Sequence, residues 1–254
     1  MNFRLRAASR VALFHLLISV IASSAILAFI FFTWFPSPYD AIIGPFAPIA
    51  ITVLSVSVIG PVLSLFLFSP TKESWKWRID LVIIVLVQLT TLAFGLTAIS
   101  SMRPIFLAFE GDRFRVVRGG DVDSSTLSNT TIEFRRFALS GPKLIGVKLL
   151  GSEDPGFVSS LVAAFEGNHP SFRPERWVDF ESQLPALISK SKSLELISNS
   201  QQSDGVIESW RRDAMVASRS LGYFPLVSDK VTDWIVVIDK TTGKPVKILN
   251  VDGW

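Results

Sequence analysis

Three long apolar runs fill the first hundred residues, and this feature restricts the possible folds more than any other. Residues 11–35 and 42–68 contain no Asp, Glu, Lys or Arg, and a third run covers about residues 79–101. A helix needs about 20 apolar residues to cross a hydrocarbon core of about 30 Å. The sequence therefore predicts a transmembrane anchor over residues 1–102, with three spans at about 11–35, 42–68 and 79–101.

A cleavable signal peptide is the alternative explanation of the first run. Three arginines precede it, and small residues at positions 23 and 25 resemble a cleavage site. The apolar region of a signal peptide is typically about 7 to 15 residues long. Here the run continues to Trp34 and Phe35, so the sequence favours an uncleaved helix with an aromatic end at the membrane interface.

The placement of basic residues predicts the orientation of this anchor. The cations of residues 1–102 all precede the first run or lie between the second and third: Arg4, Arg6, Arg10, Lys72, Lys76 and Arg78. Between the first two runs the only charge is Asp40. The positive-inside rule then places the amino terminus in the cytoplasm. We expect a multi-pass protein of a bacterial inner membrane, with residues 103–254 in the periplasm.

Residues 103–254 are the right size for one folded domain. Their basic and acidic residues balance, so the pI of 9.3 comes from the membrane-flanking cations and no nucleic-acid partner is indicated. Short β-rich runs predict strands at 105–110 and 113–117, forming a hairpin, and at 143–150, 223–227, 234–239 and 245–250. Helical spacing predicts helices after Asp154, over 178–197 and over 203–218. The expected class is α+β with antiparallel strands.

Several polar or helix-breaking residues lie within the spans, where such residues are candidates for function. They are His15, Ser57, Gly60, Pro61, Asp80 and Gln88. His15 has two interpretations, a proton relay or a neutral side chain that bonds to a neighbouring helix or headgroup. The second is favoured, because no other titratable group lies deep in a span. Small residues such as Gly60 indicate close helix packing, within the anchor or with a foreign helix.

Catalytic and metal-binding signals are weak. The chain has no cysteine, which excludes thiol nucleophiles and cysteine-based zinc sites. His169 is the single histidine after residue 103, and no Gly-x-Ser-x-Gly segment holds a nucleophile. We therefore expect no enzyme activity, no cofactor and no metal.

The sequence resembles the type IV pilin accessory proteins over nearly its whole length. In the spans the resemblance rests on residues 15–19 (HLLIS), 34–38 (WFPSP), Gly60-Pro61 and 68–70 (FSP), with Asp80 and Gln88-Leu89. Beyond them it rests on 103–107 (RPIFL), Phe109-Glu110, 112–114 (DRF), 223–227 (YFPLV), Asp233-Trp234 and 252–254 (DGW).

This resemblance implies an inner-membrane chaperone or assembly factor for a type IV pilin, the major pilus subunit. The spans would pack beside the pilin helix among membrane lipids, and the outer domain would contact the pilin head by adding a strand at a sheet edge. The candidate contact residues are Arg103, Pro104, Phe106, Glu110, Asp112, Arg113 and Phe114. Two alternatives stay open: a membrane-anchored sensor or scaffold that binds a small ligand, and an enzyme that modifies pilin or a lipid-linked sugar.

Overall fold

The computed structural model describes residues 2–135, 137–194, 197, 220–229 and 231–254. The chain divides into two compact units. The first comprises residues 1–40 and 44–103 and holds the long helices. The second comprises residues 41–43 and 104–254 and holds an eight-stranded sheet.

Three long helices make up the first unit. They are α1 (Asn2–Phe29), which a π-helical turn η1 (Ile30–Trp34) extends, α3 (Phe46–Leu67) and α4 (Ser74–Met102). The short α2 (Tyr39–Ile43) follows η1 in the chain, and its last three residues belong to the second unit. α1, α3 and α4 are all long and apolar enough to cross a membrane. The prediction of three apolar helices is confirmed, and the protein is membrane-anchored. α1 and α4 begin at Asn2 and Ser74, before the predicted starts at about 11 and 79, because the basic segments that precede those two spans are also helical.

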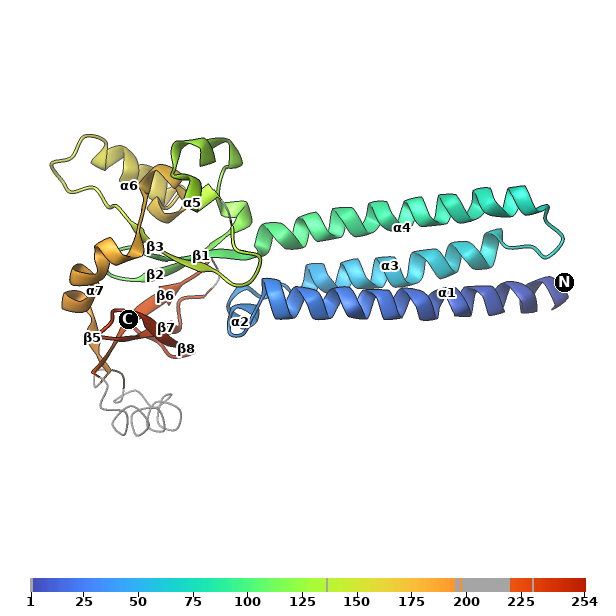
Figure 1. Cartoon of the computed structure of the whole chain (residues 1–254), viewed down its shortest axis with the longest axis horizontal. Helices are drawn as coiled ribbons and strands as arrows, with labels where there is room; N and C mark the ends of the chain where they lie inside the picture. The colour runs from blue at the N-terminus through green and yellow to red at the C-terminus, as the bar shows by residue number, and fades with distance from the viewer. Residues whose placement is uncertain (1, 136, 195–196, 198–219, 230) are drawn as a thin grey trace. The chain divides into compact units, whose positions relative to one another are not determined.

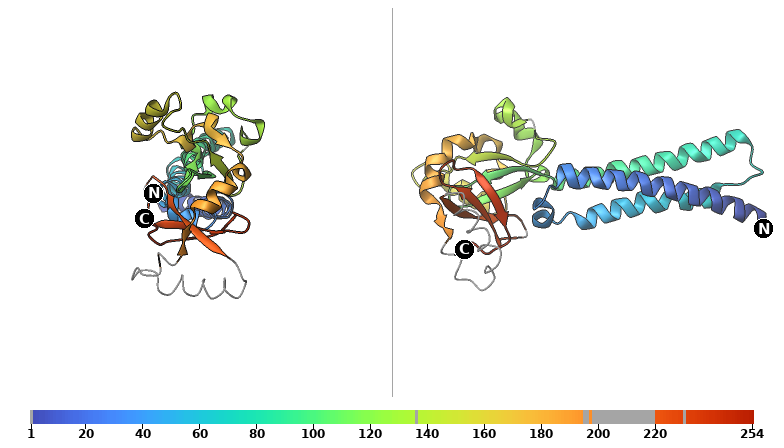
Figure 2. Two further views of the ribbon diagram at one scale, coloured as in Figure 1. Left: turned by 90° about the vertical axis from the view of Figure 1, so that its left-hand side faces the viewer. Right: turned by 60° about the horizontal axis from the view of Figure 1, so that its bottom comes forward.

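Small residues set the packing of this unit. α3 packs against both α1 and α4, and the three helices run side by side (Figures 1 and 2). A Cβ atom added at Gly60 would lie 2.1 Å from Nε2 of Gln88, and one at Gly95 would lie 2.4 Å from Oγ1 of Thr52. Such contacts are too short for any real side chain. The glycines therefore allow the approach that close packing of membrane helices needs.

A mixed sheet forms the centre of the second unit. Its strands are β1 (Pro104–Phe109), β2 (Phe114–Arg118), β3 (Lys143–Val147), β4 (Trp177–Val178), β5 (Lys192–Ser193), β6 (Leu221–Val227), β7 (Trp234–Asp239) and β8 (Pro245–Leu249). The order is β4-β3-β1-β2-β6-β7-β8, and β5 pairs with β6. The predicted β1–β2 hairpin and the antiparallel run β6–β7–β8 are confirmed. In Figure 2 the red strands of that run lie beside the green hairpin.

The predicted antiparallel strands are only part of the sheet, which is mixed. β1 pairs with β3 in parallel, and β2 pairs with β6 in parallel. Both partner strands return to the hairpin after long connections, and a connection of a dozen or more residues is what a parallel pair requires. The hairpin thereby lies inside the sheet instead of at its edge.

Aromatic side chains cover both faces of the hairpin. Phe106 packs against Trp177 with ring centroids 4.7 Å apart, and Phe109 packs against Phe224 at 5.1 Å. All six residues of β1 are buried. A strand covered on both faces reads as a continuous apolar run, which explains why β1 shows no polar alternation.

Short helices complete the second unit. They are η2 (Gly119–Asp121), η3 (Ser124–Asn129), α5 (Ile132–Arg135), α6 (Phe157–Phe165), η4 (Pro170–Phe172), η5 (Pro174–Arg176), η6 (Phe180–Gln183) and α7 (Leu184–Lys190). The helix after Asp154 is confirmed as α6. The helix predicted over 178–197 is shorter than predicted: it is α7 alone, which begins at Leu184-Pro185, and the rest of the stretch holds the end of β4, then η6 and β5. The helix predicted over 203–218 lies outside the described residues.

Candidate partner-binding site

The hairpin turn presents an exposed ion pair at the surface of the second unit. The backbone N–H of Glu110 donates to the carbonyl of Arg113 at 2.9 Å, and Gly111 adopts a φ of +85° in the turn between them. Arg113 donates from Nε and Nη2 to the two carboxylate oxygens of Asp112, both at 2.8 Å. These hydrogen bonds lower the pKa of Asp112, so it stays ionised at neutral pH.

A buried ion pair, Glu110 with Arg115, lies two residues further from the turn on each side. Arg115 donates from Nε to Oε2 of Glu110 at 3.0 Å, and both side chains are buried. The second carboxylate oxygen of Glu110 accepts from the backbone N–H of Ser171 at 3.3 Å. Trp177 in turn donates from Nε1 to the carbonyl of Ser171 at 2.7 Å. Glu110 therefore fixes the segment η4 against the hairpin.

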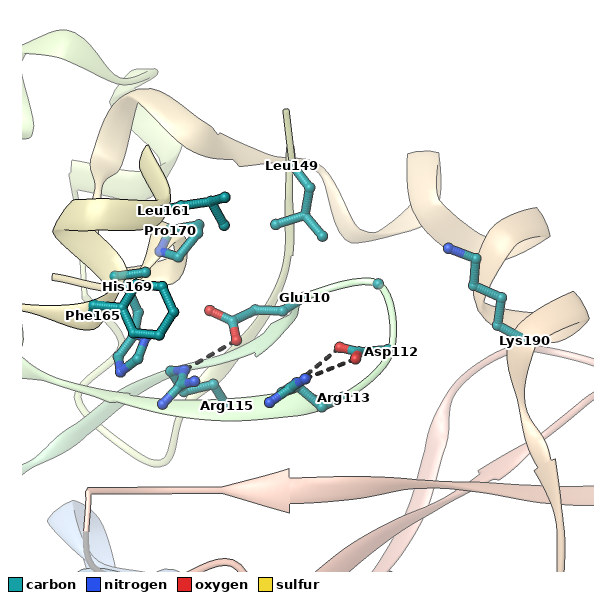
Figure 3. Close-up of a pocket in the computed structure, with 12 residues that line it drawn as sticks. Glu110, Asp112, Arg113, Arg115, Leu149, Leu161, Phe165, His169, Pro170 and Lys190 are labelled. Carbon is teal, nitrogen blue, oxygen red and sulfur yellow. Dashed lines mark hydrogen bonds and ion pairs between the residues drawn. The ribbon is translucent and has the colours of Figure 1, made fainter. Parts of the chain in front are cut away.

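A hollow of about 690 Å³ opens beside these two ion pairs. Figure 3 shows Leu161, Phe165 and His169 at one end of this hollow and Lys190 at the other, with Glu110 between them. The hollow is lined by apolar side chains of α6, by Arg113 of the turn and by Arg115 of β2. This combination suits a protein surface that carries both apolar and charged groups.

A second hollow of about 680 Å³ shares Arg113, Arg115 and His169 with the first. The guanidinium of Arg113 lies 4.8 Å from the ring centroid of Trp254, a cation–π contact. Burial lowers the pKa of His169, and the neighbouring Arg115 lowers it further, so this imidazole is neutral at pH 7. Arg113 and Arg115 thus line both hollows. Each is paired with a carboxylate, and Arg113 also contacts Trp254.

The exposed side of α6 is apolar, which is unusual for a helix at a protein surface. Val158, Leu161, Val162 and Phe165 are all exposed, and Phe165 is 90% exposed. We call these four residues the α6 apolar face. Leu161 and Phe165 also line the first hollow. Contiguous exposed apolar side chains with a charged border are typical of protein interaction sites.

The structure places most of the predicted contact residues away from the surface. Pro104, Phe106 and Phe114 are buried in the sheet, and Glu110 is buried in its ion pair. Phe106 and Phe114 are covered because a hairpin inside a sheet is packed on both faces, while Glu110 also lines the first hollow. Asp112 and Arg113 remain accessible at the turn.

Arg103 follows α4, and its guanidinium lies 5.8 Å from the ring centroid of Trp34. The α6 apolar face, Arg115 and a site role for His169 were not predicted from the sequence. The spacing of Leu161, Val162 and Phe165 was available as a signal, but helical spacing alone does not distinguish a buried stripe from an exposed one.

Within the first unit, the predicted polar residues meet at the crossing of three helices. His15 of α1 bonds through Nδ1 to Oγ of Ser64 at 2.7 Å and through Nε2 to Oε1 of Gln88 at 3.1 Å. Gln88 of α4 donates from Nε2 to the carbonyl of Val56 at 3.1 Å and to Oγ of Ser19 at 3.3 Å. His15 thus bonds to neighbouring helices, as the second interpretation of this residue describes.

The other predicted intramembrane residues lie around this polar cluster. Gly60 is packed under Gln88, and Pro61 is buried inside α3 beside it. Ser57 and Ser23 bond to each other through their hydroxyls at 3.1 Å. Asp80 lies near the start of α4 and pairs with Lys72. Among the described residues, no group of three or more His, Cys, Asp or Glu could hold a metal ion.

The fold and the site define a membrane-anchored protein whose sheet domain carries a candidate partner-binding surface. Comparison with known proteins identifies the family. The model of the fimbrial assembly protein FimB matches residues 3–44. The fimbrial assembly proteins of Dichelobacter nodosus serogroups E1 and I are both 29% identical to this chain, over 92% of it and 91% of their own length.

A third relative, the fimbrial assembly protein of Dichelobacter nodosus serogroups C1 and C2, is 31% identical over 45% of this chain and 88% of its own length. The chain therefore belongs to the fimbrial assembly protein family. This confirms the resemblance to a type IV pilus assembly family. No solved structure matches the chain.

Proposed function

We propose that this protein supports type IV pilus assembly by binding a pilin subunit in the membrane. Relatives named fimbrial assembly proteins support a role in pilus assembly. A pilin before assembly is a hydrophobic helix with a globular head, so a helper needs an apolar anchor and a domain outside the membrane. The anchor would be residues 1–102, with its amino terminus in the cytoplasm, and the periplasmic domain would be residues 103–254.

The α6 apolar face is the observation that carries this proposal for the second unit. A helix with four exposed apolar side chains loses the free energy of burying them, at about 25 cal/mol per Å² of apolar surface. A protein partner that covers the face recovers that free energy. The adjacent hollow, with Arg113 and Asp112 at its rim, would then set the orientation of the bound head through charged contacts.

The sheet order argues against strand addition at the β1–β2 hairpin. β1 already pairs with β2 and β3, and β2 pairs with β1 and β6. Among the described strands, β4, β5 and β8 each pair with one neighbour, and β4 and β8 form the ends of the sheet. We therefore assign the pilin head to the α6 face instead of to the hairpin edge.

Site-specific photocrosslinking in membranes tests this proposal. A probe at Phe165 is expected to give adducts with pilin, whereas a probe at Leu139, which is 79% exposed and does not line the hollow, is expected to give none. Phe165→Ser should reduce surface pili with unchanged protein level, and Leu139→Ser should not. Equal adducts at both positions, or none with pilin at Phe165, would contradict the proposal.

We propose a non-catalytic role, and the same variants distinguish it from the two alternatives. An enzyme acting on pilin or on a lipid-linked sugar would lose activity in His169→Ala or His15→Ala without loss of pilin binding. A small-ligand sensor would use the 690 Å³ hollow, and a bulky substitution such as Ala164→Trp would block it. For that sensor, pilin adducts at Phe165 would be absent.

A further inference from the structure

An apolar groove lies between α1 and α4 in the first unit, beside the polar cluster. Its volume is about 500 Å³, and its walls include Ile18 and Ala22 of α1 with Leu81, Val85 and Leu89 of α4. Val56 of α3 also lines it, and α3 packs against both other helices. The groove is therefore a feature of the three-helix unit itself.

The groove follows only part of the helix length. On α4 it runs from Trp77 to Leu92, which corresponds to about 22 Å at 1.5 Å per residue. Beyond Leu92 the seam is closed by Ile30, Ile49 and Ile99, which are almost completely buried, and the remaining space is about 10 Å³. A foreign helix that crosses the whole hydrocarbon core of about 30 Å would not fit along such a groove. One acyl chain from a single leaflet would.

The floor of the groove requires no polar partner. Both ring nitrogens of His15 and both ends of the Gln88 amide already form hydrogen bonds within the unit. In a medium without water, a polar ligand would have to replace those bonds. An apolar chain leaves them intact.

The open end of the groove meets a second hollow of about 520 Å³ with basic side chains. Leu67 lines both spaces, and the second is also lined by Arg4, Lys72 and Lys76. Lys72 pairs with Asp80, Lys76 pairs with Glu73 at 3.0 Å, and Arg4 donates to the carbonyl of Phe66 at 2.9 Å.

The charges at this mouth do not cancel. Three cations face two carboxylates, so one positive charge is left over beside an apolar groove. Basic residues next to a membrane span attract anionic lipid headgroups, at about 1 kcal/mol per residue. Charge and shape therefore indicate the same ligand.

We propose that this site holds one anionic phospholipid of the leaflet at the basic end. One acyl chain occupies the groove between α1 and α4, and the headgroup phosphate lies in the hollow formed by Arg4, Lys72 and Lys76. The bound lipid fills the space that the diverging α1 and α4 leave open. It thereby supports the polar cluster from the lipid side.

Native mass spectrometry of the full-length protein in detergent tests this site. The protein is titrated separately with phosphatidylglycerol, with phosphatidylcholine of the same chains, and with glycerol 3-phosphate. We expect one phosphatidylglycerol to be retained at least tenfold more strongly than phosphatidylcholine, and no retention of glycerol 3-phosphate. Equal retention of the two lipids would overturn the headgroup assignment, and binding of glycerol 3-phosphate alone would make the site a free-phosphate site.

Two matched substitutions locate the acyl chain. Leu89 lines the groove and Leu86 does not, although the two side chains are 56% and 57% exposed on the same helix. Leu89→Trp should reduce phosphatidylglycerol retention at least fivefold, and Leu86→Trp should leave it unchanged. Arg4→Gln should remove the preference for phosphatidylglycerol and retain chain binding. Equal effects of the two tryptophans, or a protein adduct instead of a lipid adduct from a photoprobe at Leu89, would refute the proposal.

Discussion

The two ion pairs of the β1–β2 hairpin provide a direct test of how burial changes the contribution of an ion pair to the stability of the fold. The change is Glu110→Ala, with Asp112→Ala as the matched control two residues away. Both carboxylates pair with an arginine of the same hairpin at similar distance, 3.0 Å for Glu110 and 2.8 Å for Asp112. They differ in exposure, because the Glu110 side chain is 7% exposed and the Asp112 side chain is 63% exposed.

The expected magnitudes follow from that difference. Removing one partner of a buried pair leaves an uncompensated charge, which costs about 3–5 kcal/mol. In Glu110→Ala the charge left behind is Arg115, and the N–H of Ser171 also loses its acceptor. An exposed pair such as Asp112 with Arg113 contributes about 0.2–1 kcal/mol. The two variants should differ by at least about 2 kcal/mol.

Hydrogen exchange of the full-length protein in detergent, read on peptides that cover β1 and β2, measures this difference locally. A factor of ten in exchange corresponds to about 1.4 kcal/mol. Glu110→Ala should therefore accelerate exchange of the hairpin amides by roughly a hundredfold or more, and Asp112→Ala by about fivefold or less.

A double variant separates loss of the ion pair from loss of packing. Replacing a buried pair by apolar side chains of similar volume is often neutral or stabilising. Glu110→Leu combined with Arg115→Met should thus restore much of the protection that Glu110→Ala removes. Exchange in Glu110→Ala that matches exchange in Asp112→Ala would refute the argument, since it would show that burial does not set the strength of the inner pair.

Three further predictions concern single residues. Gly60→Ala should lower the stability of the detergent-solubilised protein by about 2 kcal/mol in a thermal unfolding series, because an added methyl displaces Gln88 and its three described hydrogen bonds, each of about 0.6 kcal/mol. Gly243→Ala should cost about 1–3 kcal/mol in the same assay, since its φ of +69° strains any other residue. The lowered pKa of His169 means that the unfolded chain binds more protons just below pH 6.5. The stability that the neutral His169 contributes should be complete above about pH 6.5 and decrease as the pH falls below that value. His169→Gln should abolish this part of the pH dependence of the unfolding midpoint.

The three helices of the anchor were predictable because they follow from the apolar composition of their segments. Twenty or more apolar residues have few alternatives to a membrane helix, and the hairpin and the C-terminal strands follow from β-rich runs around turn residues. The meeting of His15 with Gln88 was not predictable from one sequence, although both residues were recognised as unusual. Their approach depends on Gly60 and on how three helices pack, which a hydropathy pattern does not encode.

The burial of the candidate contact residues was hard to predict from the sequence, for a physical reason. Phe114 lies between Arg113 and Arg115, and the apolar run that holds Phe106 is bounded by Arg103 and Glu110, a pattern that fits both a core strand and an exposed binding strand. Only the sheet order, with β3 and β6 on either side of the hairpin, decides for the core. On α6 the opposite error occurs, because Leu161 and Phe165 have the spacing of a buried stripe and lie at the surface.

The interior position of the hairpin has a consequence for synthesis of the protein. β2 pairs with β6 through Arg115 and Val227, residues more than 100 positions apart in the sequence. A ribosome therefore completes the hairpin long before it makes β6, the strand that pairs with the outer edge of β2. During that interval the nascent domain carries an apolar strand with unpaired backbone groups, the state in which strands of different chains join. Fast translation through the connecting segment, or a factor that shields β2 meanwhile, would then determine how much of this protein reaches its folded form.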